Sequence, residues 1–235
     1  MPVSLAAQLK EGTKKSHTMA ENTGFVSCFL KGVVDKSTYR KLIADLYFVY
    51  SAMEDELGRL SKEGHPVIKN IGFQELYRRE TLEQDLAFYF GENWLHVLEA
   101  SSSAKAYSDR IRHVANIQPE LLVGHHYTRY IGDLSGGQIL KRIAQKAMNI
   151  NGNNGLRFYE FDLIPDQKEF KVRYRTILDS LPIDQSMADL IVLEANQAFK
   201  CNMDMFKELE GNLISALGKV LFRLITSRKK KGSTD

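Results

Sequence analysis

The sequence has few of the residues that build covalent or zinc-based frameworks. Its 235 residues include only two cysteines, Cys28 and Cys201, which are far apart and form no C-x-x-C pair. This excludes a disulfide framework and a cysteine-based zinc site, and it favours a reducing compartment. The N-terminal residues hold no apolar core followed by a cleavage site, so we predict no secretory signal and a cytoplasmic protein.

The chain also lacks a long apolar run and an excess of one charge. The stretch LISALGKVLFRLI near the C-terminus is interrupted by Lys219 and Arg223, and it falls short of the ~20 apolar residues that span a bilayer. We therefore expect no membrane anchor. The net charge is +3, and without the four positive charges of residues 228–231 and Asp235 there are 28 charges of each sign. This neutral body gives no indication of nucleic-acid binding.

Prolines are also few, and all five stand where helices start or turns are expected. Asp166 and Asp184 are predicted to cap the helices that follow them. Strand patterns are nearly absent: LRFYEFDLI (156–164) could be extended, but no partner strand is evident. We predict one all-α domain. Its expected helices are roughly 4–20, 37–61, 73–90, 94–116, 119–149, 166–180 and 184–226.

Three glycines stand inside the helix expected over 119–149, in the stretch YIGDLSGGQ. Each of Gly132, Gly136 and Gly137 costs ~1 kcal/mol relative to alanine in a helix interior. Gly132 and Gly136 share a face, so the backbone there is open either to another helix or to a flat ligand. No Lys-Ser/Thr pair follows, which excludes a phosphate loop. Asp133 is either a surface charge or, beside a ligand, an anchor for water.

A second pattern lies in LKEGTKKSHTMAEN. Lys10, Lys14, His17 and Glu21 fall at i, i+4, i+7 and i+11 and so form one helical stripe. Such a stripe can hold an anion at its lysine end and a metal at the histidine, because neutral imidazole is the commonest protein metal ligand. The alternative is a solvated lysine face with a surface histidine.

A third pattern is the basic stretch FKVRYRTILDSL. Lys171 and Arg175 are four residues apart on one helix face, whereas Arg173 points elsewhere. They form either a solvated basic face or, across a cleft from Lys10 and Lys14, a clamp for two carboxylates.

A fourth pattern is the stretch EANQAFKCNMDMFKELE, where Phe199, Met203 and Phe206 form an apolar stripe beside Asn202. Such a stripe is more often core than a cofactor site. Taken together, the four stretches resemble heme oxygenase in order and separation, over essentially the whole chain. The resemblance is nearest to the soluble enzymes of photosynthetic microbes, and Ile131 stands where leucine is common in that family.

The resemblance implies a single-domain helical fold over residues 1–226, with heme between a proximal and a distal helix, and a basic, disordered tail over 227–235. It implies that His17 is the axial ligand of the heme iron and that Glu21 orients it. It places Asp133 at the distal water. The remaining pocket residues that it implies are Gly132, Gly136, Gly137, Tyr50, Arg129, Phe199 and Asn202 around the heme, and Lys10, Lys14, Tyr127, Lys171 and Arg175 at its propionate edge.

The resemblance also implies a reaction. Heme is both substrate and cofactor, so the protein supplies position and electrostatics. With O2 and reducing equivalents, heme is cleaved to biliverdin, in its IXα form, ferrous iron and CO, for heme degradation and bilin synthesis. Electrons are expected from a reductase or a ferredoxin. A downstream bilin reductase is a further expected partner.

Two other functions are compatible with parts of the pattern. A heme carrier or sensor would use His17 and the basic cleft without turnover. A purely structural helical protein would leave the glycines with a packing role alone. A ferritin-like di-iron protein is excluded, because it needs Glu-x-x-His pairs and none of the six histidines has glutamate three residues before it.

Overall fold

The computed structural model describes residues 4–230, with side chains through residue 210, and all regular elements in this part are helices. The α-helices are α1 (Leu5–Gly12), α2 (Lys14–Glu21), α3 (Gly24–Leu30), α4 (Lys36–Lys62), α5 (Arg79–Phe90), α6 (Trp94–Val97), α7 (Ser102–Ile117), α8 (Leu122–His126), α9 (Gly132–Met148), α10 (Gln167–Asp179) and α11 (Gln185–Lys230). Short helical turns are η1 (Ile68–Asn70), η2 (Gln74–Leu76), η3 (Pro119–Leu121), η4 (Tyr127–Ile131) and η5 (Arg157–Tyr159). The all-α prediction is confirmed.

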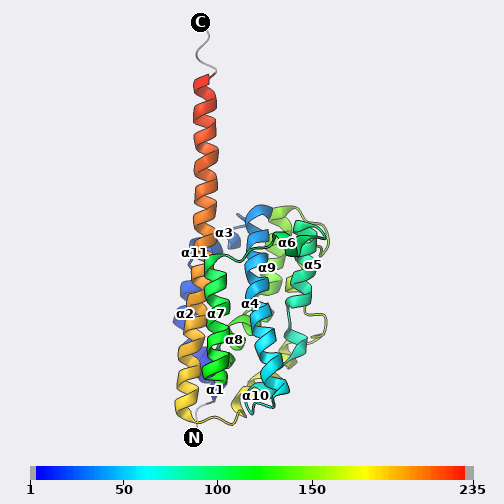
Figure 1. Cartoon of the computed structure of the whole chain (residues 1–235), viewed down its shortest axis with the longest axis vertical. Coiled ribbons are helices and arrows are strands. Elements are labelled where there is room, and N and C mark those ends of the chain that lie inside the picture. The colour runs from blue at the N-terminus through cyan, green and yellow to red at the C-terminus, as the bar shows by residue number, and fades with distance from the viewer. Residues whose placement is uncertain (1–3, 231–235) are drawn as a thin grey trace.

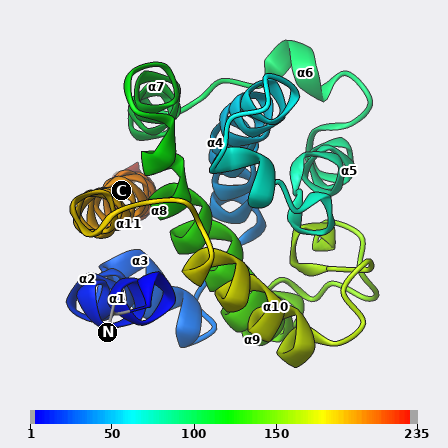
Figure 2. The ribbon, with the colours of Figure 1, turned by 90° about the horizontal axis from the view of Figure 1, so that it is seen from below.

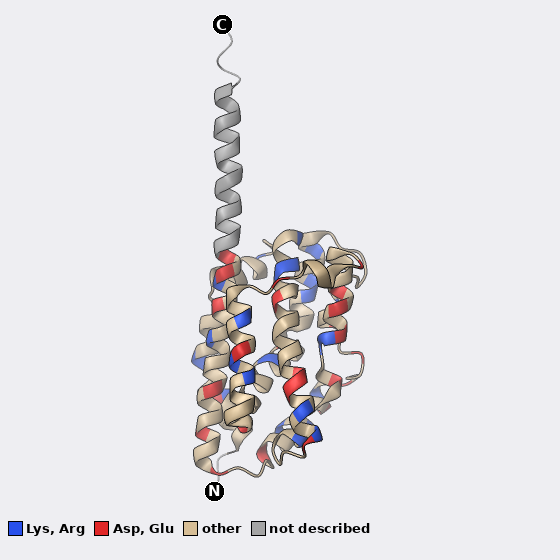
Figure 3. Cartoon of the chain, in the orientation of Figure 1, with Lys and Arg blue, Asp and Glu red and all other residues tan. Residues whose placement is uncertain are grey.

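The helices form a bundle with an attached N-terminal layer. The long helices α4, α7 and α11 run along the long axis of the molecule (Figure 1). α4 packs against α5 and α7, and α11 packs against α7 and α8. Viewed along that axis, α1–α3 lie on one side of the diagonal formed by α8 and α9 (Figure 2). Charged residues of both signs are interspersed along the visible helices, as the neutral composition predicts (Figure 3).

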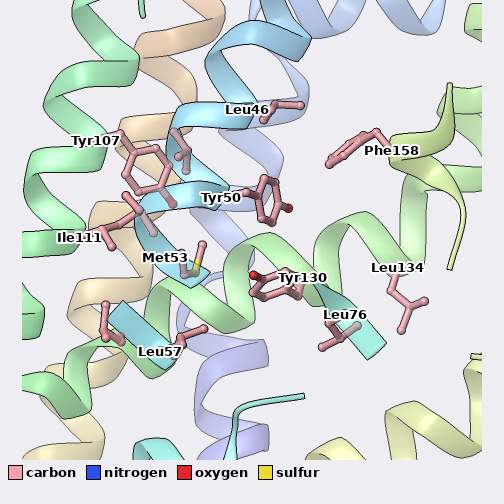
Figure 4. Close-up of a cluster of buried hydrophobic side chains, with 14 of the residues drawn as sticks. Leu46, Tyr50, Met53, Leu57, Leu76, Tyr107, Ile111, Tyr130, Leu134 and Phe158 are labelled. Carbon is pink, nitrogen blue, oxygen red and sulfur yellow. The ribbon is translucent and has the colours of Figure 1, made fainter. Parts of the chain in front are cut away.

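The core is built on α4, whose apolar residues recur every three or four positions. Leu46, Tyr50, Met53 and Leu57 are buried on this helix, and they point toward the side chains of neighbouring helices (Figure 4). The spacing matches the 3.6-residue helical period, so one stripe of α4 faces inward. Asp35 caps the helix by accepting the backbone N–H of Thr38 at 2.9 Å.

Several helix limits differ from the sequence prediction. The pattern over 4–20 is divided at Thr13, which separates α1 from α2, and α3 was not predicted. The segment 156–164 contains the helical turn η5 rather than a strand. Helix α11 extends to Lys230, beyond the expected end at residue 226. Residues 231–235 lie outside the described part of the chain, so the domain boundary at residue 227 stays a prediction.

The helix expected over 119–149 is not continuous. It begins with η3 and α8, passes through the π-helical turn η4 and continues as α9. A π turn inserts an additional residue into the helical path, and such turns are frequent at functional sites. Here the turn ends at Ile131, directly before Gly132, so it sets which face of α9 is presented toward α1–α3.

Candidate functional site

Two cavities lie on either side of one face of α9. The first, the basic cavity, has a volume of about 550 Å³ and is lined by Ile131 and Ser135 from this region and by residues of α1 and α10. The second, the apolar cavity, has a volume of about 80 Å³ and is lined by Asp133 and Leu140, with residues of α3, α4 and α11. The N-terminal layer therefore contributes to both cavities, through α1 in the basic cavity and through α3 in the apolar cavity.

Gly132 and Gly136 form a bare strip of helix between the two cavities. A Cβ atom added at either glycine meets no side chain or other element within 4 Å. At 100° per residue, these positions fall between the Ile131 side of α9 and the Asp133 side. Of the two interpretations of the glycines, the open space favours a ligand over a packed helix.

Gly137 differs from the other two glycines. It is buried, and a Cβ atom added there lies 3.3 Å from the Tyr159 ring. Its lack of a side chain therefore serves contact with the segment that carries Tyr159. The predicted heme contact of Gly137 stays a prediction, because the tight contact with Tyr159 already explains the lack of a side chain here.

His17 lies on α2 with more than half of its side chain exposed, at 57%. Its ring meets the edge of Phe199 on α11, with 5.9 Å between centroids. The Nδ1 atom lies 3.7 Å from a carboxylate oxygen of Glu21, too far for a direct hydrogen bond. Nδ1 is the ring nitrogen beside Glu21, so we expect Nε2 to be the one available to a metal.

The position of α2 is fixed by hydrogen bonds to α11. Asn196 accepts a hydrogen bond from the Ser16 hydroxyl at 2.5 Å and donates one to the carbonyl of Gly12 at 3.0 Å. These contacts lie at the last residue of α1 and at Ser16 of α2, directly before His17. They hold the histidine at a fixed place relative to α11.

The predicted distal residues meet around Asp133. The Tyr50 hydroxyl and the Arg129 guanidinium both donate to its carboxylate, the latter at 3.1 and 3.3 Å. Arg129 also donates to the amide oxygen of Asn202 at 2.8 Å. Burial raises the pKa of Asp133 and lowers that of Arg129. The four residues come from three separate helical regions and form one connected polar group.

A buried extension of this group was not indicated by the sequence. Tyr107 is in hydrogen-bonding contact with Asn202 and lies 3.5 Å from Nδ1 of His125. Nε2 of His125 lies 2.8 Å from Glu194. Burial alone would raise the pKa of Glu194, but hydrogen bonds from His125 and Arg110 hold it at about 2. The extension therefore ends in an ionised carboxylate.

The basic cavity gathers most of the predicted propionate residues. Lys10, Tyr127, Lys171 and Arg175 line it, whereas Lys14 does not. Burial lowers the pKa of Lys171, and the neighbouring Arg175 lowers it further. Two like charges held close together favour an anionic ligand.

Ser135 also lines the basic cavity, although the sequence analysis did not select it. Ser135 stands one helical turn after Ile131 and inside the glycine motif, and this position could have indicated that it faces the ligand. Phe158 and Tyr159 line the apolar cavity, and no local pattern indicated them, because they stand on a segment outside the long helices.

The chain matches known proteins over nearly its whole length. Residues 3–208 match the family model described as heme oxygenase. The chain belongs to the heme oxygenase family. Heme degradation to biliverdin is the function of this family, so the predicted enzyme is confirmed and the heme carrier and the purely structural protein are set aside.

Individual relatives cover nearly the whole chain. Heme oxygenase 1 of Synechocystis sp. is 58% identical over 235 residues, which are 100% of this chain and 97% of that protein. The heme oxygenase of Porphyra purpurea is 51% identical, over 98% of this chain and 95% of its own length. The crystal structure of the Synechocystis heme oxygenase-1 in complex with heme has a TM-score of 0.89 and 59% identity, and the match covers 95% of this chain and 100% of that one.

The residues of this heme oxygenase fit heme by their chemistry. An exposed imidazole, a strip of helix without side chains and a cluster of basic groups match an iron, a flat macrocycle and two propionates, respectively. Among the described residues, we find no helix with the length and apolar character that crossing a membrane requires.

Proposed function

We propose that heme binds with its iron on His17 and its ring along the Gly132–Gly136 strip. The observation that carries this proposal is the open space at both glycines, between a basic and an apolar cavity. Bound heme supplies the iron that binds O2 and the ring carbon that is oxidised. Glu21, at 3.7 Å from Nδ1, orients the imidazole through a water molecule.

The polar group around Asp133 holds and delivers protons on the distal side. Its carboxylate is fixed by Tyr50 and Arg129, and Arg129 is fixed in turn by Asn202. A carboxylate that is held by donors from two elements can orient a water molecule without rotating away. The apolar side chains of the neighbouring cavity limit bulk water there.

The basic cavity selects the orientation of heme. Lys10, Lys171 and Arg175 hold the propionates, with the hydroxyl groups of Tyr127 and Ser135 beside them. Two fixed propionates prevent rotation of the ring in its plane, so one ring edge is oxidised. The product is then the IXα form of biliverdin, with ferrous iron and CO.

Electrons come from a ferredoxin, and the biliverdin passes to a bilin reductase in the cytoplasm. The support is the set of basic side chains at the proposed heme edge, because a local positive patch attracts an acidic partner. Lys14 and Lys15 are exposed on the neighbouring helix α2. Arg173 is less available to an acidic partner, because its guanidinium already forms an ion pair with Glu75 at 2.7 Å.

The test is an absorption spectrum with added hemin, followed by reductant in air. We expect a heme complex in the wild-type chain that is converted to a bilin after reductant is added. A complex that stays intact under reduction would indicate a carrier and overturn the proposed turnover. A complex whose ferric spectrum is the same in His17→Ala would overturn the assignment of the ligand.

A further inference from the structure

The segment 155–160, here called the wall segment, forms one side of the apolar cavity. Phe158 and Tyr159 line this cavity together with Asp133. The Phe158 ring lies 5.7 Å from that of Tyr50, and the two side chains are neighbours in Figure 4. The shape of the space beside Asp133 therefore depends on where the wall segment is held.

The wall segment contains one short helical turn, in which the N–H groups of Tyr159 and Glu160 donate to backbone carbonyls of the same segment. The N–H groups of Arg157 and Phe158 instead depend on a side chain from another element. The two carboxylate oxygens of Asp85, on α5, accept the N–H groups of Arg157 and Phe158, both at 2.8 Å. Asp85 is fully buried. Since buried N–H groups without a partner are costly, both carboxylate oxygens are needed where they stand.

The carbonyl groups of the same segment are held in a similar way. Arg78 donates to the carbonyls of Phe158 and Glu160, and Gln138 donates to that of Tyr159 at 2.9 Å. Arg78 and Gln138 hold carbonyls, which leaves Asp85 as the group that holds the two N–H groups at the start of η5.

We propose that Asp85 is a positioning residue of the active site: it fixes Phe158 and Tyr159, and through them the distal space beside Asp133. Asp85 itself does not line the cavity. The inference rests on the proposed function, in which the apolar cavity lies on the O2-binding side of heme.

The charge of Asp85 changes near neutral pH. Burial raises its pKa to about 7, against the opposing effects of the two N–H groups and of the Arg157 guanidinium. The charge of Asp85 acts on three neighbouring tyrosines, Tyr39, Tyr89 and Tyr159, which stay neutral because burial raises their pKa values. A protonated carboxyl loses acceptor capacity, so one of the two N–H groups is held less well as the pH falls through this value.

The first test is hydrogen–deuterium exchange of the heme-free protein. In Asp85→Asn we expect protection of residues 157 and 158 to fall by about tenfold or more, since a hydrogen bond to a charged group is lost. The matched control is Asp162→Asn, because Asp162 accepts from the Arg157 side chain at 2.5 Å rather than from the backbone. Unchanged exchange in α4 and α7 shows that the variant is folded. Unchanged protection of the wall segment in Asp85→Asn would overturn the proposal.

The second test uses the heme complex. In Asp85→Asn we expect a changed association rate of CO with the reduced heme, while the ferric spectrum that reports His17 is unchanged. The wild-type rate should vary with pH between about 6 and 8, around the value at which Asp85 titrates, and this variation should be lost in the variant. If hydrogen exchange shows a loosened wall segment but the CO association rate and its pH dependence are those of the wild type, Asp85 has a purely structural role and the proposal is overturned. Failure of the proposed function is distinguishable, because it appears in the wild-type chain as the absence of a heme complex on His17.

Discussion

Tyr50 on α4 donates a hydrogen bond to the carboxylate of Asp133 on α9, although 83 residues separate them in the chain. Arg129 donates to the same carboxylate from one helical turn away. Two donors from different elements thus fix an acidic group that lies beside both the glycine strip and the apolar cavity.

Asp133→Ala should reduce biliverdin yield per electron and increase oxidation of added phenols. The expected loss of biliverdin is about a hundredfold, as for a group that positions a proton donor. Heme affinity should stay near the wild-type value, since Asp133 holds no propionate. Tyr50→Phe should have a smaller effect because Arg129 still holds the carboxylate. An unaffected biliverdin yield in Asp133→Ala would contradict the role.

His17→Ala should change the ferric absorption spectrum and remove most turnover. Some heme should remain bound, because the basic cavity is intact. Added imidazole should restore part of the wild-type spectrum by replacing the missing ligand. His96→Ala, an exposed histidine on α6, is the control and should behave as wild type.

Gly136→Leu and Gly137→Leu should act on different properties. At Gly136 the new side chain enters open space, so the heme-free protein should gain up to ~1 kcal/mol in its free energy of unfolding from helix propensity. Its reduced heme complex should bind O2 slowly. At Gly137 the side chain meets Tyr159, and overpacking should cost ~1–3 kcal/mol. Thermal unfolding and O2 association distinguish the two. Normal O2 association in Gly136→Leu would refute the proposal that the heme ring lies along the Gly132–Gly136 strip.

Replacing Lys171 and Arg175 together by alanine should release the propionates and produce other biliverdin isomers. The matched control removes Lys168 and Arg173 from the same helix, with the same change in charge but no change in the lining of the basic cavity. Separation of the bilin isomers by chromatography measures the outcome. If the double variant gives the wild-type isomer ratio, steric contacts such as that of Phe199 must control orientation instead.

Turnover driven by ferredoxin should fall steeply with added salt, because exposed charges are screened over a Debye length of ~8 Å at physiological ionic strength. Turnover driven by a small neutral reductant should not. Lys15→Glu should weaken the first reaction more than Arg173→Glu, since Arg173 is already paired with Glu75. If both reactions responded equally to salt, the partner surface would lie elsewhere.

The sequence by itself determined the family, the helical class and most helix positions. Local patterns suffice for these, because helical periodicity and caps act within a few residues. Asp166, for example, accepts from the N–H groups of Lys168 and Glu169 as its motif predicts. The glycine motif by itself left two interpretations open, a packed helix or a flat ligand, and only the resemblance to the family selected the ligand.

Only the tertiary structure decided how these parts meet. It showed that Gly137 packs against Tyr159, which comes from a distant segment, whereas Gly132 and Gly136 face open space. It brought the Tyr50 hydroxyl within hydrogen-bonding distance of Asp133, and Asp85 within hydrogen-bonding distance of the wall segment. Lys14 shares the predicted stripe with Lys10 but does not line the basic cavity. Periodicity reports which side chains share a face of one helix, whereas the neighbours of that face depend on how separate helices pack.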